Sequence, residues 1–266
     1  MIVSKIKSLL MHNWIFYLVG FSIAFVIKYF YSNSPYYDFI WILAPTTWWV
    51  RILSGIIFEY KANIGYINHH FRFIIASSCL GIEFMIITMV TLIYSFVHLA
   101  RAMRMKFYWT ILSLVFSYLF TIFVNGFRII FSIYIPIYLN KMIVYNGWLT
   151  PERLHTIIGT FIYFTSLFFI YQVAGYIWKD IYSIKYKDIS FIRIVSKYLM
   201  PMFWYFIILL GVPFLRNGYN EELKEYTILI TSVCLIAVAI FCSVSFIRKW
   251  QGKHGRKIDT IAKWTQ

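Results

Sequence analysis

Three residues that lie far apart in the sequence could perform chemistry together: Cys79, Arg128 and His155. A thiolate can attack the carbonyl carbon of an amide, and an imidazole can move protons between the thiol and the leaving amine. A guanidinium, which stays charged, would stabilise the thiolate and donate hydrogen bonds to the developing oxyanion. These residue types therefore predict acyl transfer that depends on a cysteine.

Each of the three residues lies at the end of a long apolar segment. The pairs are Cys79 before 80–98, Arg128 after 107–125 and His155 before 156–178. About 20 apolar residues predict a helix that spans a bilayer, because no backbone polar group can stay unpaired in hydrocarbon. Spans that alternate in direction would bring all three side chains to one membrane boundary. Singly, the thiol could be a packing residue, the guanidinium could snorkel to phosphates and the imidazole could be interfacial.

The composition requires a non-aqueous surrounding for most of the chain. Hydrophobic residues make up 61% of the 266 positions and charged residues 13%, against about 45–50% and about 25% in soluble proteins. Three further stretches predict spans: 12–30, 200–216 and 226–247. We therefore predict an all-α, polytopic bundle of six clear transmembrane helices.

The segment 39–58 is ambiguous. It contains Pro45, Arg51 and a Trp pair within an otherwise apolar run. This pattern is compatible with an interfacial helix, a re-entrant helix or an additional span. The position of the three candidate residues does not depend on which of these is correct.

The basic residues predict the orientation in the membrane. The formal net charge is +15, and 16 of the 25 Lys and Arg residues fall in the segments 1–11, 99–106, 179–199 and 248–266. The positive-inside rule then places both termini in the cytoplasm and the three candidate residues at the outer face. The basic residues form no groove interleaved with aromatic residues, so we expect membrane lipids and no nucleic acid as partners.

The chain predicts one membrane unit in two parts. Residues 1–178 form a core with a retained N-terminal anchor, and 179–266 form a two-helix extension behind a basic linker at 179–188. Cys234 and Cys242 lie in one apolar segment and are expected to be packing residues rather than parts of a disulfide framework.

Two further residues could support the chemistry. Asn125 shares a helical face with Arg128, so it could orient the guanidinium, contribute to an oxyanion site or make an ordinary helix-end hydrogen bond. Glu83 lies one turn after the cysteine and could pair with Arg128 or Arg72, or simply satisfy an interior cation.

We predict neither a metal nor another cofactor. The pair His69–His70 and the spacing Glu152-x-x-His155 supply metal-ligating side chains, but no further ligands cluster with them in the sequence. A structural or catalytic metal site would need three or four such groups.

The surroundings of the three residues resemble a known family. They read ASSCLGIEF at 76–84, NGFRII at 125–130 and ERLHTIIGTFIYF at 152–164. In this order they resemble the exosortase and archaeosortase family, whose core has a Cys followed by a small residue, Gly and an aliphatic residue, then Asn-x-x-Arg, then a His that leads into a helix with a glycine. Leu80 departs from the pattern, and the resemblance covers about 40–178.

The resemblance implies a membrane-embedded cysteine protease or transpeptidase. Cys79 would be the nucleophile, Arg128 would stabilise charge and His155 would be the general acid and base. The implied substrates are secreted proteins with a C-terminal sorting signal, made of a short motif, a transmembrane helix and a basic cluster. The implied location is the cytoplasmic membrane of a bacterium or archaeon, with the active site facing outside.

Two other functions fit the same residues. A transporter subunit or scaffold for surface-protein or polysaccharide export could use Arg128 and His155 in a polar path, with discontinuous helices around Pro45, Pro136 and Pro201. A membrane acyltransferase with a lipid substrate would need similar chemical groups.

Overall fold

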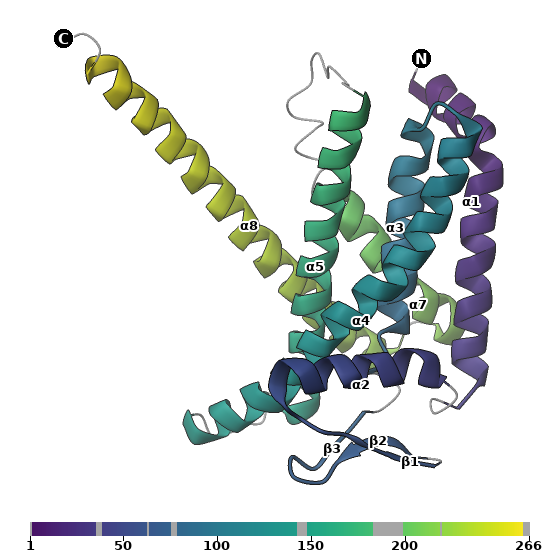
Figure 1. Cartoon of the computed structure of the whole chain (residues 1–266), viewed down its shortest axis with the longest axis vertical. Helices are drawn as coiled ribbons and strands as arrows, with labels where there is room; N and C mark the ends of the chain where they lie inside the picture. The colour runs from purple at the N-terminus through teal and green to yellow at the C-terminus, as the bar shows by residue number, and fades with distance from the viewer. Residues whose placement is uncertain are drawn as a thin grey trace.

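The computed structural model describes residues 2–35, 39–62, 64–75, 79–142, 148–182, 199–218 and 220–262. Seven labelled α-helices make up most of the fold (Figure 1): α1 Ile2–Asn33, α2 Ile40–Ser54, α3 Ile82–Phe96, α4 Met103–Met142, α5 Pro151–Tyr182, α7 Val212–Asn217 and α8 Glu221–Ala262. Short helical turns follow α3 at Val97–Leu99 and precede α7 at Ile207–Gly211. Most of the predicted linker at 179–188 lies outside the described residues.

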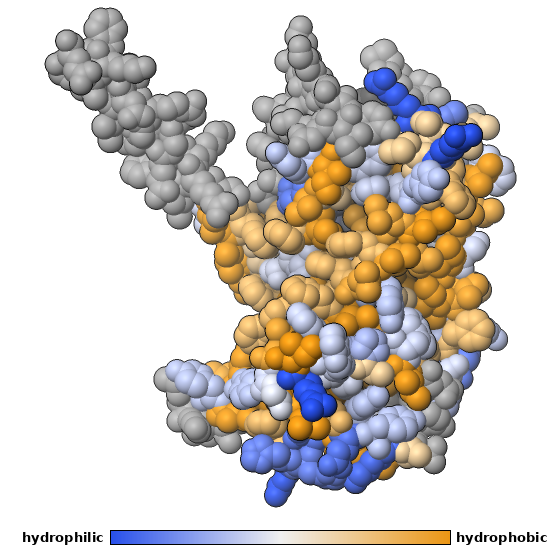
Figure 2. All heavy atoms as spheres, viewed as in Figure 1, coloured by the Kyte–Doolittle hydropathy of each residue, from blue (hydrophilic) through white to orange (hydrophobic). Residues whose placement is uncertain are grey.

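The prediction of an all-α polytopic membrane protein is confirmed. Among the described residues, five helices are long and apolar enough to cross a membrane: Met11–Asn33, Ile82–Leu99, Met103–Leu139, Pro151–Trp178 and Glu221–Val244. The sixth predicted span, 200–216, coincides with the shorter apolar helix Leu199–Leu215. Figure 2 shows an apolar band across the middle of the molecule, with hydrophilic residues gathered toward its two ends.

Helix α3 lies at the centre of the bundle. In its most apolar window 72% of the residues are buried, against 17–44% in the other four candidate spans. Apolar side chains therefore cover it on nearly every side, as expected for a helix that is hydrophobic all round. Because α3 is central, the segment that leads into it also enters the protein interior.

Helix α2 does not have the length of a membrane span. Its 15 residues extend about 22 Å at 1.5 Å per residue, less than the roughly 30 Å hydrocarbon core. It runs across the ends of the long helices (Figure 1). Thr46 and Val50 are buried on one face, whereas Trp41 and Trp48 are exposed. This amphipathic arrangement favours the interfacial interpretation of 39–58.

Two of the three prolines considered for the transporter alternative do not interrupt their helices. Pro45 lies inside the continuous helix α2, and Pro136 lies inside the continuous helix α4. The discontinuous helices that would suit the transporter alternative are therefore not seen at these two prolines, because membrane helices tolerate proline when neighbouring groups satisfy the freed carbonyls. Pro201 lies in the first turn of Leu199–Leu215, where the missing N–H costs little.

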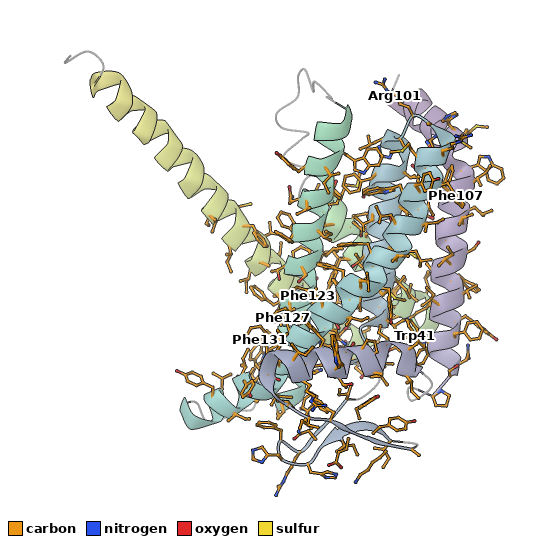
Figure 3. All side chains as sticks on the ribbon, in the orientation of Figure 1. Trp41, Arg101, Phe107, Phe123, Phe127 and Phe131 are labelled. Carbon is orange, nitrogen blue, oxygen red and sulfur yellow. The ribbon has the colours of Figure 1, made fainter. Side chains whose placement is uncertain are left out.

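Helix α4 is also longer than predicted. It continues past the expected end at residue 125 and reaches Met142. Phe123, Phe127 and Phe131 follow one another at intervals of four along it (Figure 3), and Phe123 and Phe131 are exposed. This row gives α4 an apolar outer face while its opposite face carries buried polar residues.

A small antiparallel sheet, which the sequence did not predict, precedes α3. Its strands are β1 Glu59–Lys61, β2 Gly65–Asn68 and β3 Phe73–Ile74, in the order β1-β2-β3. Asn68 donates a hydrogen bond to the carbonyl of Ile57 and accepts one from the backbone of Phe71, at 2.7 Å each. The sheet lies beneath α2, at the end of the molecule away from the beginning of α1 (Figure 1).

The C-terminal helices pack on the same bundle. Tyr205, Ile230 and Cys234 are buried in one cluster with Phe84 and Phe164 of the core. Cys234 is thus a packing residue as predicted. In contrast, Cys242 lies about two turns further along α8 and is exposed, so it does not pack in the protein core as predicted.

Replacing Gly126 with valine should weaken the attachment of α2 to α4. A Cβ atom at this position would lie 2.5 Å from Cδ1 of Trp49, so the indole must move. Overpacking of this kind costs about 1–3 kcal/mol. We expect a melting temperature several degrees lower in detergent micelles, followed by tryptophan fluorescence. Gly211→Ala is the matched control, because nothing lies within 4 Å of its added methyl. Equal melting temperatures for the two variants would contradict this packing.

Candidate active site

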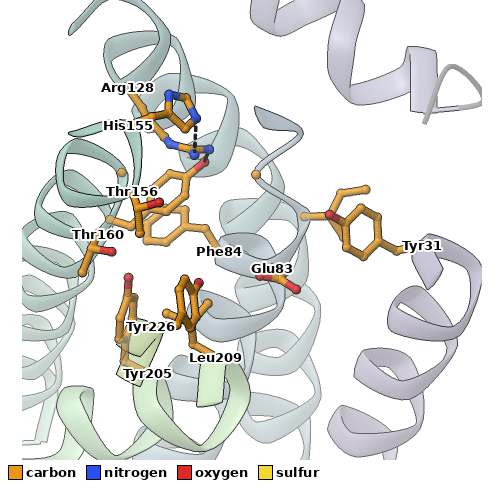
Figure 4. Close-up of a pocket in the computed structure, with 14 residues that line it drawn as sticks. Tyr31, Glu83, Phe84, Arg128, His155, Thr156, Thr160, Tyr205, Leu209 and Tyr226 are labelled. Atoms are coloured by element: carbon orange, nitrogen blue, oxygen red, sulfur yellow. Dashed lines mark hydrogen bonds between the residues drawn. The ribbon is translucent and has the colours of Figure 1, made fainter. Parts of the chain in front are cut away.

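The structure brings together the three residues that the sequence singled out. The sulfur of Cys79 lies 3.5 Å from Nε2 of His155, although 76 positions separate the two residues. The same Nε2 atom lies 3.0 Å from Nη2 of Arg128 (Figure 4). A thiol, an imidazole and a guanidinium therefore share one small volume at the junction of three separate elements.

The geometry fixes which partner donates. A guanidinium N–H can only donate a hydrogen bond, so Nε2 of His155 accepts from Arg128 and carries a lone pair. The thiol of Cys79 lies beside the same nitrogen, which is consequently the atom that can take the thiol proton. A proton on Nε2 would then face the guanidinium, and charge repulsion favours passing it on to a leaving group. The arrangement suits a proton shuttle.

Asn125 and Tyr163 close these contacts into a ring. Asn125 Nδ2 donates to the carbonyl oxygen of Cys79 at 2.6 Å, and the Tyr163 hydroxyl donates to Asn125 Oδ1 at 2.7 Å. Arg128 Nη1 donates to the same hydroxyl at 3.1 Å. The hydrogen bonds thus run from the backbone of Cys79 through Asn125, Tyr163, Arg128 and His155 to the Cys79 sulfur. Asn125 therefore reaches Arg128 only through the Tyr163 hydroxyl, and it also holds the backbone of Cys79, a contact that the sequence did not suggest.

Aromatic packing holds the ring in place. The Tyr163 ring stacks on Phe84 with centroids 4.5 Å apart and an interplanar angle of 7°. The guanidinium carbon of Arg128 lies 4.9 Å from the Tyr163 ring centroid, within the range of a cation–π contact. Asn125 is 2% exposed and Arg128 6% exposed. At this burial the polar groups depend on each other for hydrogen bonds.

Two glycines allow the elements to approach closely. Gly81 has φ +75°, and a Cβ there would lie 3.0 Å from Thr121 Cγ2 and 3.2 Å from the amide carbon of Asn125. It ends the turn that contains Cys79 and is the residue before the first turn of α3. A Cβ on Gly159 of α5 would lie 2.7 Å from Nε of Arg128. Larger residues at either position would displace the ring.

Some expected helix positions need correction. Arg128 lies inside α4 rather than beyond its end, because the helix continues to Met142. Similarly, His155 lies within the first turns of α5, which begins at Pro151. Cys79 precedes α3 in a tight turn and is 4% exposed. Depth in the bundle, rather than a helix terminus, is what these three residues share.

Glu83 has a different partner from the two that the sequence suggested. Its carboxylate pairs with Lys28 of α1 at 2.5 Å, rather than with Arg128 or Arg72. The reason is that α1 packs beside α3 and carries Lys28 to the depth of the first α3 turn. Lys28 also lies 5.2 Å from the ring centroid of Tyr31. Glu83 therefore satisfies an interior cation, which was the alternative interpretation.

A cavity of about 310 Å³ adjoins the ring (Figure 4). Its walls come from α1, the start of α3, α4, α5, the helix Leu199–Leu215 and α8. They are Tyr31, Gly81, Ile82, Glu83, Phe84, Arg128, His155, Thr156, Gly159, Thr160, Tyr163, Tyr205, Leu209 and Tyr226. Because Arg128 and His155 face this space, a substrate group placed in it would meet the proton shuttle directly.

Metal ligation receives no support from the described residues. They contain no group of three or more His, Cys, Asp or Glu side chains that could hold an ion. His69 lies 3.8 Å from Glu59 on the sheet. No family model, curated protein or solved structure matches this chain. The resemblance to exosortases and archaeosortases consequently stays a prediction that rests on its motifs.

Sequence reasoning missed Tyr163 and the role of Gly159, although a signal was present. His155, Gly159 and Tyr163 are spaced by four residues, which places them on one face of α5. Similar spacing on α4 places Thr121, Asn125 and Arg128 on one face of that helix. Lys28 gave no such signal, because its partner belongs to a helix 55 positions away.

Gly159→Ala should impair the site without unfolding the protein. The added methyl would lie 2.7 Å from Nε of Arg128, so the guanidinium must leave the imidazole. We expect iodoacetamide to alkylate Cys79 about tenfold more slowly, the loss that one charge-assisted hydrogen bond produces. Gly175→Ala on the same helix is the control, because its methyl would be 3.9 Å from Phe96. Equal alkylation rates in both variants would show that the position of Arg128 does not depend on the absence of a side chain at Gly159.

Tyr163→Phe tests the hydroxyl of the ring separately from its packing. The phenyl ring keeps the stack on Phe84, whereas the hydrogen bonds to Asn125 and Arg128 are lost. We expect the rate of Cys79 alkylation to fall about fivefold to tenfold, and the melting temperature to fall by a few degrees because two buried groups lose a hydrogen-bond partner. Tyr118→Phe is the control, since it removes a hydroxyl bonded to the Trp41 carbonyl away from the site. A similar decrease in both variants would remove the positioning role of Tyr163.

Proposed function

We propose that this chain is a membrane-embedded cysteine protease or transpeptidase that cleaves C-terminal sorting signals of secreted proteins at the outer membrane boundary. The observation that supports it most is the distance of 3.5 Å between the Cys79 sulfur and Nε2 of His155, with Arg128 at 3.0 Å from the same nitrogen. A nucleophile and its base within contact distance are the basic requirement for covalent acyl transfer.

The proposed reaction has two steps, acylation of Cys79 and release of the acyl group. His155 takes the thiol proton, the sulfur of Cys79 bonds to the carbonyl carbon, and the carbonyl electrons move to the oxygen. Arg128 stabilises the oxyanion as it forms. Collapse of this intermediate breaks the C–N bond, and the leaving amine takes the proton from His155. The thioester is then attacked by water or by another nucleophile, whose proton returns the thiol to its starting state.

The position of the site agrees with a substrate that is itself anchored in the membrane. Residues of all five candidate spans line the cavity beside the ring. The sheet and α2 lie at the end of the bundle where α3 begins (Figure 1), and Cys79 directly precedes α3. The beginning of α1 and the end of α8 lie toward the opposite end. If the positive-inside rule holds here, the ring faces outside. A peptide bond just outside the transmembrane helix of a substrate would lie at the same depth in the membrane as the ring.

Cys79→Ala should abolish processing and leave the protein folded. The thiol is small and buried, so alanine fits its space, while the nucleophile is lost. In cells that produce this variant, secreted proteins with a C-terminal motif, helix and basic tail should keep that tail. Mass spectrometry of their C-termini measures the result. Unchanged processing in well-expressed Cys79→Ala would refute the proposed nucleophile.

The exposed thiol on α8 provides the matched control. Cys242→Ala removes an exposed cysteine, whereas Cys79 is the thiol beside His155, so processing should continue at the wild-type rate. If both variants are well expressed and lose processing equally, the loss is not specific to the thiol beside His155, and the proposed role of Cys79 is wrong.

A further inference from the structure

We infer that the C-terminal helices select the substrate: Tyr205, Leu209 and Tyr226 form the floor of a pocket for one uncharged, hydrogen-bonding side chain next to the cleaved bond. This inference rests on the proposed function and names the substrate class of the same site. It also gives a role to residues beyond 178, which the family resemblance does not cover.

The location of the three residues supports this assignment. They line the same cavity as Arg128 and His155, yet they come from Leu199–Leu215 and α8. In Figure 4 the rings of Tyr205 and Tyr226 extend into the cavity from the side opposite the His155–Arg128 hydrogen bond. If the carbonyl of the cleaved bond is held near the Cys79 sulfur, the adjacent side chain of the substrate points toward this floor.

Core packing makes the floor rigid. Tyr205 is 1% exposed, and its ring lies 5.5 Å from that of Phe164 in an edge-on contact. Cys234 of α8 belongs to the same buried cluster. A floor that several helices hold in place can select substrates by shape, because its side chains cannot move aside for a larger group.

The size of the cavity admits one substrate side chain together with part of its backbone. Its volume of about 310 Å³ is at the lower end of ligand pockets, which measure about 300–1,000 Å³. Helical or lipid groups would need considerably more room. The side chain of Leu209 limits the depth of the pocket. A smaller residue at this position should therefore admit a bulkier substrate side chain.

The chemistry of the walls indicates a neutral polar group. Hydroxyl-bearing residues line the cavity from several elements, among them Thr156, Thr160, Tyr205 and Tyr226. The two charged groups in the lining are already engaged: Glu83 pairs with Lys28, and Arg128 donates to His155 and Tyr163. Arg128 lies on the side of the cavity opposite the two tyrosines (Figure 4), so a charge at the floor would have no partner there. Burying an unpaired charge costs far more than burying an amide whose hydrogen bonds are satisfied. An amide or hydroxyl side chain therefore fits this pocket better than an aspartate, a lysine or a purely aliphatic group.

Peptidyl acyloxymethyl ketones test the inference, because they alkylate a cysteine nucleophile and carry a chosen side chain beside the reactive carbon. The full chain in liposomes, with Cys234→Ala and Cys242→Ala, leaves Cys79 as the target. We expect the glutamine ketone to react about tenfold faster than its near-isosteric norleucine counterpart. Tyr226→Phe should reduce this ratio to about twofold or less, while Tyr118→Phe should keep it.

A second variant tests the floor independently of the hydroxyl. Leu209→Ala should raise the rate of the tryptophan ketone relative to the glutamine ketone about tenfold, because it removes the bulk that limits depth. Equal ratios in wild type, Tyr226→Phe and Leu209→Ala would overturn the inference while leaving the proposed nucleophile intact. Failure of every ketone and of iodoacetamide to modify wild-type Cys79 would instead refute the proposed function.

Discussion

The structure depends on a buried guanidinium that is held by neutral partners. Arg128 lies inside a membrane helix at 6% exposure, where a charged group is expensive. Hydrogen bonds to His155 and Tyr163, together with the ring face of Tyr163, surround it. Since each partner also bonds to another member of the ring, a change in one side chain affects all of them. The site is therefore a single cooperative unit.

Close approach of the helices makes this unit possible. Gly159 leaves space for the guanidinium against α5, and Gly81 lets the cysteine turn lie against Asn125 of α4. The central position of α3 then brings the sulfur into the interior. The C-terminal helices close the cavity from the remaining side through Tyr205 and Tyr226. Small residues at helix contacts have the same effect in many membrane proteins.

The sequence predicted the parts that depend on composition and on order along the chain. Long apolar runs indicate spans, and alternation of spans was enough to bring Cys79, Arg128 and His155 together. It did not predict the full length of α4, because polar residues such as Asn125 remain helical when other helices satisfy them. Short mixed strands such as Glu59–Lys61 lack a periodic signal. The pairing of Lys28 with Glu83 depends on how two distant helices pack.

The placement of Arg128 indicates which charge the ring stabilises. In a serine-type triad an acid bonds to Nδ1 of the histidine and stabilises the imidazolium. Here a cation lies on Nε2, the nitrogen that also faces the thiol. It disfavours a positive imidazole and favours negative charge on the neighbouring sulfur or on an oxyanion. In the proposed reaction the arginine would thus act on the nucleophile and the intermediate, and the histidine would hold the proton only briefly between them.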